Sequence, residues 1–190
     1  MNHRLFPSFI IFMILLLAGC VSTHQAGSLS VTDSIRTNLL PTSAMEGSID
    51  ALQLLSGSYG EHTFSVQTYT CADTSRISMT VMSTMGNTIA SLAYEGDAIT
   101  KASHTIAGVP FPAEYLFFDF QLCFYQAQAI AKALAPLGLS FVERREGNVT
   151  YRVLSEGKQI IATIEKRDHQ VSFANVLRGY SYQIEELGDA

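Results

Sequence analysis

Hydrophobic and polar side chains alternate along most of the chain with the period of two that is typical of half-buried β-strands. In the first half, this pattern predicts strands at residues 49–55, 63–70, 76–84, 88–94 and 98–102. In the second half, it predicts strands at residues 139–144, 148–155, 158–166, 170–176 and 180–186, with Val149, Tyr151 and Val153 as the apolar positions of the second one. Glycine, asparagine and aspartate residues separate the strands, so tight antiparallel hairpins are expected.

One helical segment interrupts the two series of strands. Pro112 can occupy the first turn of a helix, and Pro136 and Gly138 are expected to end it. At 100° per residue, one apolar arc comprises Leu116, Phe120, Cys123, Phe124, Ala127, Ile130, Ala131 and Leu134. A bend is expected near Tyr125. The chain is therefore predicted to have an α+β fold, a curved antiparallel sheet of about ten strands that forms an incomplete barrel, with central helices packed on its concave face.

Some large apolar side chains of this segment fall outside the main arc, namely Phe111, Tyr115, Phe117, Phe118 and Leu122. They predict an exposed apolar surface or contacts with a ligand. Flexible methionines lie on nearby strand positions and adapt well to hydrocarbon. The candidate ligand-binding residues are therefore Met79, Met82, Phe117, Phe120 and Phe124. The alternative is that these side chains simply form the core.

The amino-terminal residues have the pattern of an export signal. Arg4 is followed by ten consecutive apolar residues, 9–18, which are too few to span a bilayer, for which about 20 are needed. The next residues complete a Leu-Ala-Gly-Cys sequence that resembles the bacterial lipobox, in which the cysteine becomes the lipidated first residue of the mature protein. This resemblance implies lipid attachment at Cys20, and Val21 after it favours the periplasmic face of the outer membrane. The alternative is an incidental cysteine after an ordinary signal.

The chain is expected to comprise a signal peptide at residues 1–19, a lipidated flexible tether at residues 20–40, and one periplasmic domain at residues 41–190. The tether is inferred from many serine and threonine residues and few large apolar ones. Loss of the signal peptide would leave 11 Lys and Arg against 17 Asp and Glu, a net charge of −6. A nucleic-acid partner is therefore not expected.

Catalytic, metal and cofactor motifs do not emerge from the sequence, so no enzyme, metal site or cofactor is predicted. The histidines at positions 24, 62, 104 and 169 are far apart and are expected in solvated turns. Asp119 is expected either to reach solvent or cap a backbone group beside the apolar arc or, if it is desolvated, to have a raised pKa and act as an acid or base. Cys71 and Cys123 are expected to be buried free thiols, and the alternative is a disulfide bond between them.

Three segments resemble an uncharacterised bacterial lipoprotein family whose genes often lie beside aryl polyene biosynthesis genes. They are residues 119–125 (DFQLCFY), 54–60 (LLSGSYG) and 173–184 (FANVLRGYSYQI). The last segment is also similar to the final hairpin of the LolA and LolB lipoprotein carriers. That resemblance implies an incomplete barrel that shelters acyl chains under a helical lid, and transfers no catalytic residue. The family motif usually has tryptophan where this chain has Phe124-Tyr125.

The leading expectation is an outer-membrane lipoprotein that accepts a hydrophobic lipid or lipoprotein cargo, such as an aryl polyene lipid, from a LolA-like periplasmic carrier. A second hypothesis is a structural or assembly lipoprotein whose aromatic surface binds an envelope protein. A third is an enzyme that acts on envelope lipids or glycans through Asp119.

Overall fold

The computed structural model describes residues 25–104 and 112–188. The proposed signal peptide, Cys20, His24 and Phe111 lie outside the described residues. Ten long strands follow the predicted segments within a few residues: β4 (Ile49–Tyr59), β5 (His62–Ala72), β6 (Arg76–Met82), β7 (Thr88–Glu95), β8 (Ala98–His104), β9 (Leu139–Glu146), β10 (Val149–Glu156), β11 (Gln159–Arg167), β12 (Gln170–Asn175) and β13 (Tyr180–Glu186). The predicted alternation is thus confirmed as antiparallel strands.

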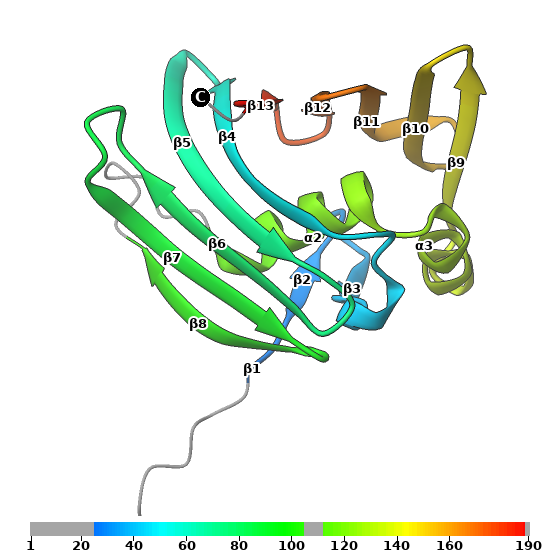
Figure 1. Ribbon diagram of the computed structural model, residues 1–190. Coiled ribbons are helices and arrows are strands. Elements are labelled where there is room, and N and C mark those ends of the chain that lie inside the picture. The colour runs from blue at the N-terminus through cyan, green and yellow to red at the C-terminus, as the bar shows by residue number, and fades with distance from the viewer. Residues whose placement is uncertain (1–24, 105–111, 189–190) are drawn as a thin grey trace, which may run out of the picture.

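These strands and the two-residue β1 (Gln25–Ala26) form one sheet in the order β1-β8-β7-β6-β5-β4-β13-β12-β11-β10-β9. The two predicted series of hairpins meet where β4 pairs with β13, at the middle of the sheet. No pairing joins β9 to β1 in the part of the chain that the structure describes, so the sheet is an open, curved half-barrel (Figure 1). This confirms the predicted α+β fold.

The helical segment is divided into two helices, α2 (Ala113–Phe124) and α3 (Ala127–Leu134). The break falls at the expected bend, because the extended Tyr125 forms an antiparallel bridge with Met45. The flanking amides confirm this pairing, since Glu46 donates to the carbonyl of Phe124 and Gln126 donates to that of Ala44. After α3, the short 3-10 helix η3 (Ala135–Leu137) ends at Gly138, which has a φ of 79°.

Residues that we expected to be a flexible tether are instead packed against α2. After β1, strands β2 (Ser28–Ser30) and β3 (Arg36–Asn38) form a small hairpin, followed by the 3-10 helix η2 (Thr42–Ala44). Leu29 is 2% exposed, and Val31 and Leu39 are also buried. The tether interpretation is therefore wrong for residues 28–40, because a few apolar side chains in a serine- and threonine-rich segment suffice to dock it.

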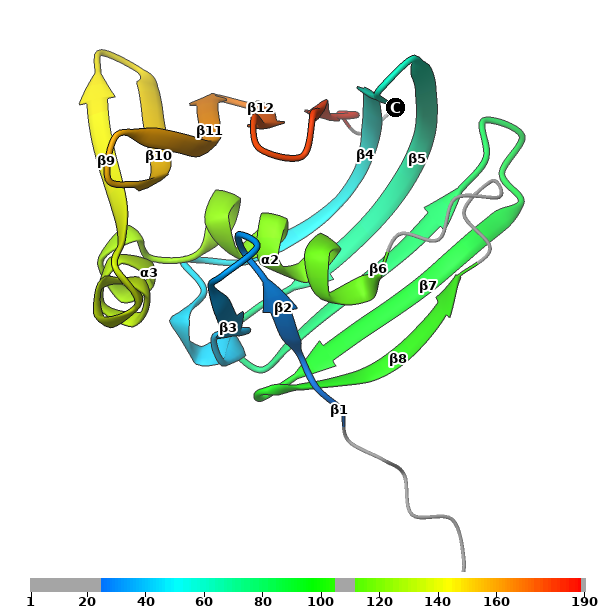
Figure 2. The same cartoon turned by 180° about the vertical axis from the view of Figure 1, so that it is seen from behind.

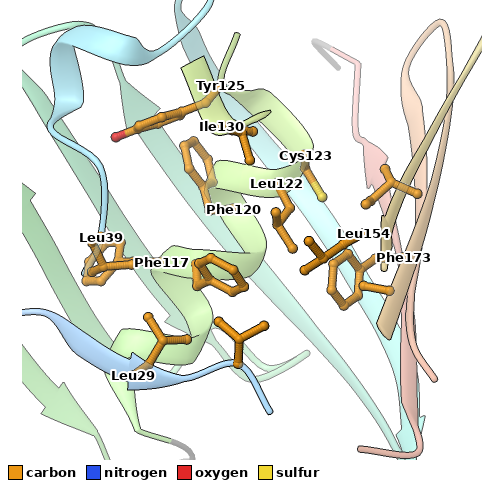
Figure 3. Packing of buried hydrophobic residues seen from close by; sticks show 14 of the residues in the cluster. Leu29, Leu39, Phe117, Phe120, Leu122, Cys123, Tyr125, Ile130, Leu154 and Phe173 are labelled. Carbon is orange, nitrogen blue, oxygen red and sulfur yellow. The ribbon is translucent and has the colours of Figure 1, made fainter. Parts of the chain in front are cut away.

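Helix α2 lies between this hairpin and the concave face of the sheet (Figures 1 and 2). Leu29 and Leu39 lie on one side of the helix and Leu154 and Phe173 on the other, with Phe117 and other helical side chains between them (Figure 3). This arrangement overturns the expectation that the large side chains outside the main apolar arc of the helix form an exposed apolar surface. Phe117, Phe118 and Leu122 are buried because the hairpin covers the face that the sheet does not.

Substitution of Leu29 by alanine should distinguish a docked hairpin from a tether. We expect Leu29→Ala to lower the free energy of unfolding by about 2 to 5 kcal/mol, because it leaves a cavity against α2. Urea unfolding of the chain without residues 1–20 measures this change. Val142→Ala is the control, since Val142 is 56% exposed on β9 and should change stability little. Equal, small effects of both substitutions would contradict the docked hairpin.

Candidate functional site

A buried arginine holds the carboxyl end of α2 on the sheet. Arg152 on β10 is 1% exposed and donates through Nη1 to the carbonyls of Leu122 and Cys123, both at 2.9 Å. Its guanidinium also pairs with Glu143 at 2.7 Å and with Glu46 at 3.6 Å. A cation at this end complements the helix dipole and satisfies carbonyls that the helix leaves open.

The inward position of Arg152 differs from the expected pattern of β10. Arg152 and Leu154 face the core, whereas Tyr151 and Val153, expected as the apolar positions of a half-buried strand, are only partly buried on the other face. The apolar alternation alone favoured the opposite face. The observed face places the guanidinium of Arg152 at the helix end and the side chain of Leu154 in the core.

The amino-terminal segment is attached to α2 by Gln121. Its buried amide donates to the Leu40 carbonyl at 2.8 Å and accepts from the Leu40 amide at 2.9 Å. The hydroxyl of Tyr94 on β7 donates to the same carbonyl at 2.9 Å. One side-chain amide therefore joins the helix to the segment that follows β3, and Tyr94 extends that connection to the sheet.

Asp119 lies at the centre of a second polar network, between α2 and the last hairpin. It is 1% exposed, and its Oδ2 accepts from the Tyr180 hydroxyl at 2.7 Å. Asn175 donates to the same hydroxyl at 3.3 Å. The Asp119 Oδ1 has no hydrogen-bond partner among the described residues. The expectation that Asp119 reaches solvent is therefore wrong.

Burial raises the pKa of Asp119 to about 8, and this effect outweighs the opposing hydrogen bond from Tyr180 and the charge of Arg178. Burial, together with the negative charge of Asp119, also raises the pKa of Tyr180. The raised pKa agrees with the second expectation for Asp119. In this conformation the carboxyl is buried, and its hydrogen bond from Tyr180 joins α2 to the sheet.

The three segments that carry the family resemblance meet at this network. Asp119 belongs to the first of them and Tyr180 to the last, where Asn175 also accepts from the Arg178 amide and stabilises the turn. In the remaining segment, Gly57 on β4 lies opposite Tyr182 on β13, and a Cβ at Gly57 would lie 2.2 Å from the Ser181 carbonyl oxygen. The seam between β4 and β13 therefore requires glycine.

The candidate ligand-binding residues do not share one surface. Phe117 and Phe120 are buried, and Phe117 packs against Tyr94 with ring centroids 5.3 Å apart. Phe124 is half-buried, 4.8 Å from Phe120, with the Lys166 ammonium 5.3 Å from its ring. Met79 and Met82 are both half-buried, but they lie on opposite faces of β6. The space between α2 and strands β10 to β13, where the resemblance places acyl chains, is filled by core side chains.

Cys71 and Cys123 are both free, as expected, but only Cys123 is buried. Burial raises the pKa of the Cys123 thiol to about 12, so it is poorly reactive. The exposed position of Cys71 corrects the expectation of burial, because its side chain projects from the outer face of β5. His62 and His169 are exposed, and His169 lies 3.2 Å from Glu186. The side chain of His104 lies outside the described residues.

Five residues with exposed apolar side chains lie at one end of the sheet. This apolar rim, with exposed fractions between 38 and 58%, consists of Tyr59, Phe64, Ile160, Val176 and Leu177. Backbone hydrogen bonds connect its parts, because Val176 and Leu177 both donate to the carbonyl of Ile161, and Gly60 donates to that of Gly179. The rim continues into the concave face, where the half-buried Leu55 pairs with Val66 and Ile184.

The rim was not predicted from the sequence. Each of its members is an ordinary apolar residue in a strand or turn, and only the pairing of strands far apart in the chain brings them together. The two apolar residues in the turn after β12 are a weak signal, since tight turns usually carry polar side chains. Contiguous exposed apolar surface is typical of a site that binds a protein, a membrane or a ligand.

A cavity of about 610 Å³ opens on the other face of the sheet, over β4 and β9 to β13. Its lining alternates with the residues that contact α2, and includes Tyr151, Glu165, Ser172 and Gln183. The Arg144 guanidinium lies 5.3 Å from the centre of the Tyr151 ring. These hydroxyl, amide and charged groups do not suit hydrocarbon, so this cavity is a poor candidate for an acyl chain.

Two further kinds of site are absent from residues 25–104 and 112–188. No helix there is long and apolar enough to cross a membrane. Within the same ranges, no three or more histidine, cysteine, aspartate or glutamate side chains come together in a group that could hold a metal ion.

Asp119 should make stability depend on pH. Its pKa is higher in the folded protein than the ordinary value of 3.8, so its stabilising contribution is complete below about pH 4 and is lost as the pH rises to about 8. We expect Asp119→Asn to remove this loss, so that the variant gains stability relative to wild type between pH 5 and pH 9 in urea unfolding. Asp97→Asn, an exposed position, should keep the wild-type pH dependence. A parallel pH dependence of wild type and Asp119→Asn would contradict the buried ionisable carboxyl.

Comparison with known proteins gives a family but no activity. A search of the curated proteins finds no match to this chain. Residues 50–188 match the model of a family described as a protein of unknown function, DUF3261. The match begins in β4 and extends past β13, so it covers the whole long-stranded sheet with both helices. The chain belongs to the DUF3261 family.

Proposed function

We propose that this protein is a lipid-anchored protein of the bacterial cell envelope that binds a hydrophobic cargo, either a lipid or the acyl chains of a lipoprotein. The apolar rim and its continuation into the concave face carry the proposal. The open half-barrel has exposed aromatic and aliphatic side chains at one end. Hydrocarbon that binds to these side chains is removed from water, which is favourable. The cargo would exchange one apolar surface for another at a small net change in free energy.

The resemblance to LolA and LolB supports the same proposal and refines it. By that resemblance, the cargo comes from a LolA-like periplasmic carrier, and the receiving protein is fixed to the outer membrane through Cys20. An aryl polyene lipid is the specific cargo that the family resemblance favours. Because α2 fills the space beneath the sheet, the cargo would first contact the rim and the neighbouring residues Leu55, Val66 and Ile184.

A second candidate function is an assembly protein that binds another envelope protein. The filled interior favours it, since the described part of the core leaves little room for acyl chains between α2 and the sheet. A hollow between the helices and the amino-terminal segment, lined by Leu40, Phe118 and Ile130 among others, has about 10 Å³, which is the space of about one water molecule. Crosslinking in cells would then recover one stoichiometric protein partner through the rim.

Lipid attachment predicts a simple change of location. Full-length protein expressed in a bacterial host should sediment with membranes, because several acyl chains hold a protein firmly on a bilayer. The Cys20→Ser protein, which cannot be acylated at this residue, should move to the soluble periplasmic fraction. Incorporation of labelled palmitate measures the modification directly. A Cys20→Ser protein that stays on the membrane and still incorporates palmitate would contradict attachment at this residue.

Cargo binding should depend on the rim. We expect the protein without residues 1–20 to bind a fluorescent fatty acid, and Phe64→Ser to weaken that binding about fivefold, since loss of the partly buried ring is worth on the order of 1 kcal/mol. Val142→Ser is the matched control, because Val142 is 56% exposed on the opposite face of the sheet. Mass spectrometry of the purified protein would identify any lipid that it retains.

The two outcomes that would overturn cargo binding are distinct. One is the absence of both fatty-acid binding and retained lipid in the wild-type chain. The other is an equal loss with Phe64→Ser and Val142→Ser, which would mean that binding is not located at the rim.

A further inference from the structure

The amino-terminal segment is fixed to the sheet close to the proposed anchor. Gln25 in β1 pairs with Ile99 in β8, and Leu39 donates to the Gly27 carbonyl at 2.8 Å. Only residues 21–24 separate Cys20 from β1. Five extended steps of the chain span at most about 18 Å. A tether of residues 20–40 would have reached several times farther.

Strand β1, the described element nearest in sequence to the proposed anchor, lies at the end of the sheet opposite to the apolar rim. A single transverse row of paired residues runs from Gln25 through Ile99, Tyr94 and Ile77 to Ala72 at the end of β5. Tyr59 and Phe64 lie toward the other end of the β4–β5 hairpin, and ten residues along these strands span about 33 Å. In Figures 1 and 2, β1 lies at the bottom of the molecule and the β4–β5 turn at the top.

Charged residues are close to rim residues in the sequence. Glu61 lies two residues after Tyr59 in the β4–β5 turn, Lys158 lies two residues before Ile160, and both are exposed. A charged side chain in the hydrocarbon of a bilayer costs about 3 kcal/mol or more. The rim is therefore suited to contacts in water and not to insertion into the membrane.

From the short spacer, the position of the rim and its charges, we infer that the β1–β8 edge of the domain faces the bilayer and that the apolar rim is held away from it, toward the periplasm. The partner of the β1–β8 edge is the lipid surface itself. This inference rests on the proposed function, because it requires the anchor at Cys20. It adds the direction from which cargo reaches the protein, which is from the aqueous side.

Two labelled variants test this orientation with matched changes of charge. In a Cys71→Ser background, Asp97→Cys places a thiol in the turn beside β1, and Glu61→Cys places one in the β4–β5 turn. Cys123 is buried and should not react. Each full-length acylated protein is labelled with a small fluorophore and reconstituted into vesicles of phosphatidylethanolamine and phosphatidylglycerol that contain a lipid with a nitroxide on its headgroup.

Because nitroxide quenching acts over a short range, the label at position 97 should lose several times more fluorescence than the label at position 61. A long Gly-Ser insertion after Val21 should reduce this difference. The same labels on protein without residues 1–20 should lose little fluorescence. Equal quenching at both positions, or stronger quenching at position 61, would overturn the inferred orientation.

The outcomes separate this inference from the proposed function. A chain that fails to associate with vesicles would overturn the anchor and the orientation together. A chain that associates, and that binds fatty acid through Phe64 but is quenched at position 61, would retain the proposed function and lose the orientation. A chain that is quenched only at position 97 but binds no fatty acid would retain the orientation and lose the cargo.

Discussion

The burial of α2 on two sides is the constraint on which the rest of the structure depends. A helix with large apolar side chains around most of its circumference cannot remain on a protein surface. The concave sheet covers one side, and the amino-terminal hairpin covers the other. The polar groups of this helix then find hydrogen-bond partners in three different parts of the chain. Gln121 pairs with Leu40, Asp119 pairs with Tyr180, and the last carbonyls of the helix accept from Arg152. Such buried polar contacts fix the position of the helix more narrowly than apolar packing alone.

Local periodicity was sufficient to predict the strands and the helical segment, because alternation and turn residues act over a few neighbouring positions. It was insufficient where the environment is set by distant segments. Residues 28–40 have too few apolar side chains to be recognised as part of a core, and their docking site exists only once α2 is in place. Because the hairpin that covers them was not predicted, Phe117, Phe118 and Leu122 resembled surface residues. The burial of Arg152 could not be predicted, because its partners are the carbonyls at the end of a distant helix, and a pattern of side chains does not show them.

The sequence predicted a candidate site of apolar side chains, but the residues that it selected do not form one surface. Of these candidates, Phe117 and Phe120 are core residues that stabilise the helix on the sheet. The exposed apolar surface lies at the end of the half-barrel, assembled from β4, β5, β11 and the turn after β12. Hydrophobicity along the chain cannot distinguish these two sets, because both consist of the same residue types in regular elements. Only strand pairing and exposure separate them.

The seam between β4 and β13 has a consequence for how the domain forms. It joins the first and the last of the ten long strands, at the centre of the sheet instead of at an edge. Contacts between segments so distant in sequence carry a large loop-closure entropy and slow the search for the native topology. Until the final strand arrives, β4 has an unpaired side that can associate with other chains. The incomplete domain is therefore most exposed to aggregation and proteolysis in the interval before the carboxyl-terminal hairpin closes the sheet.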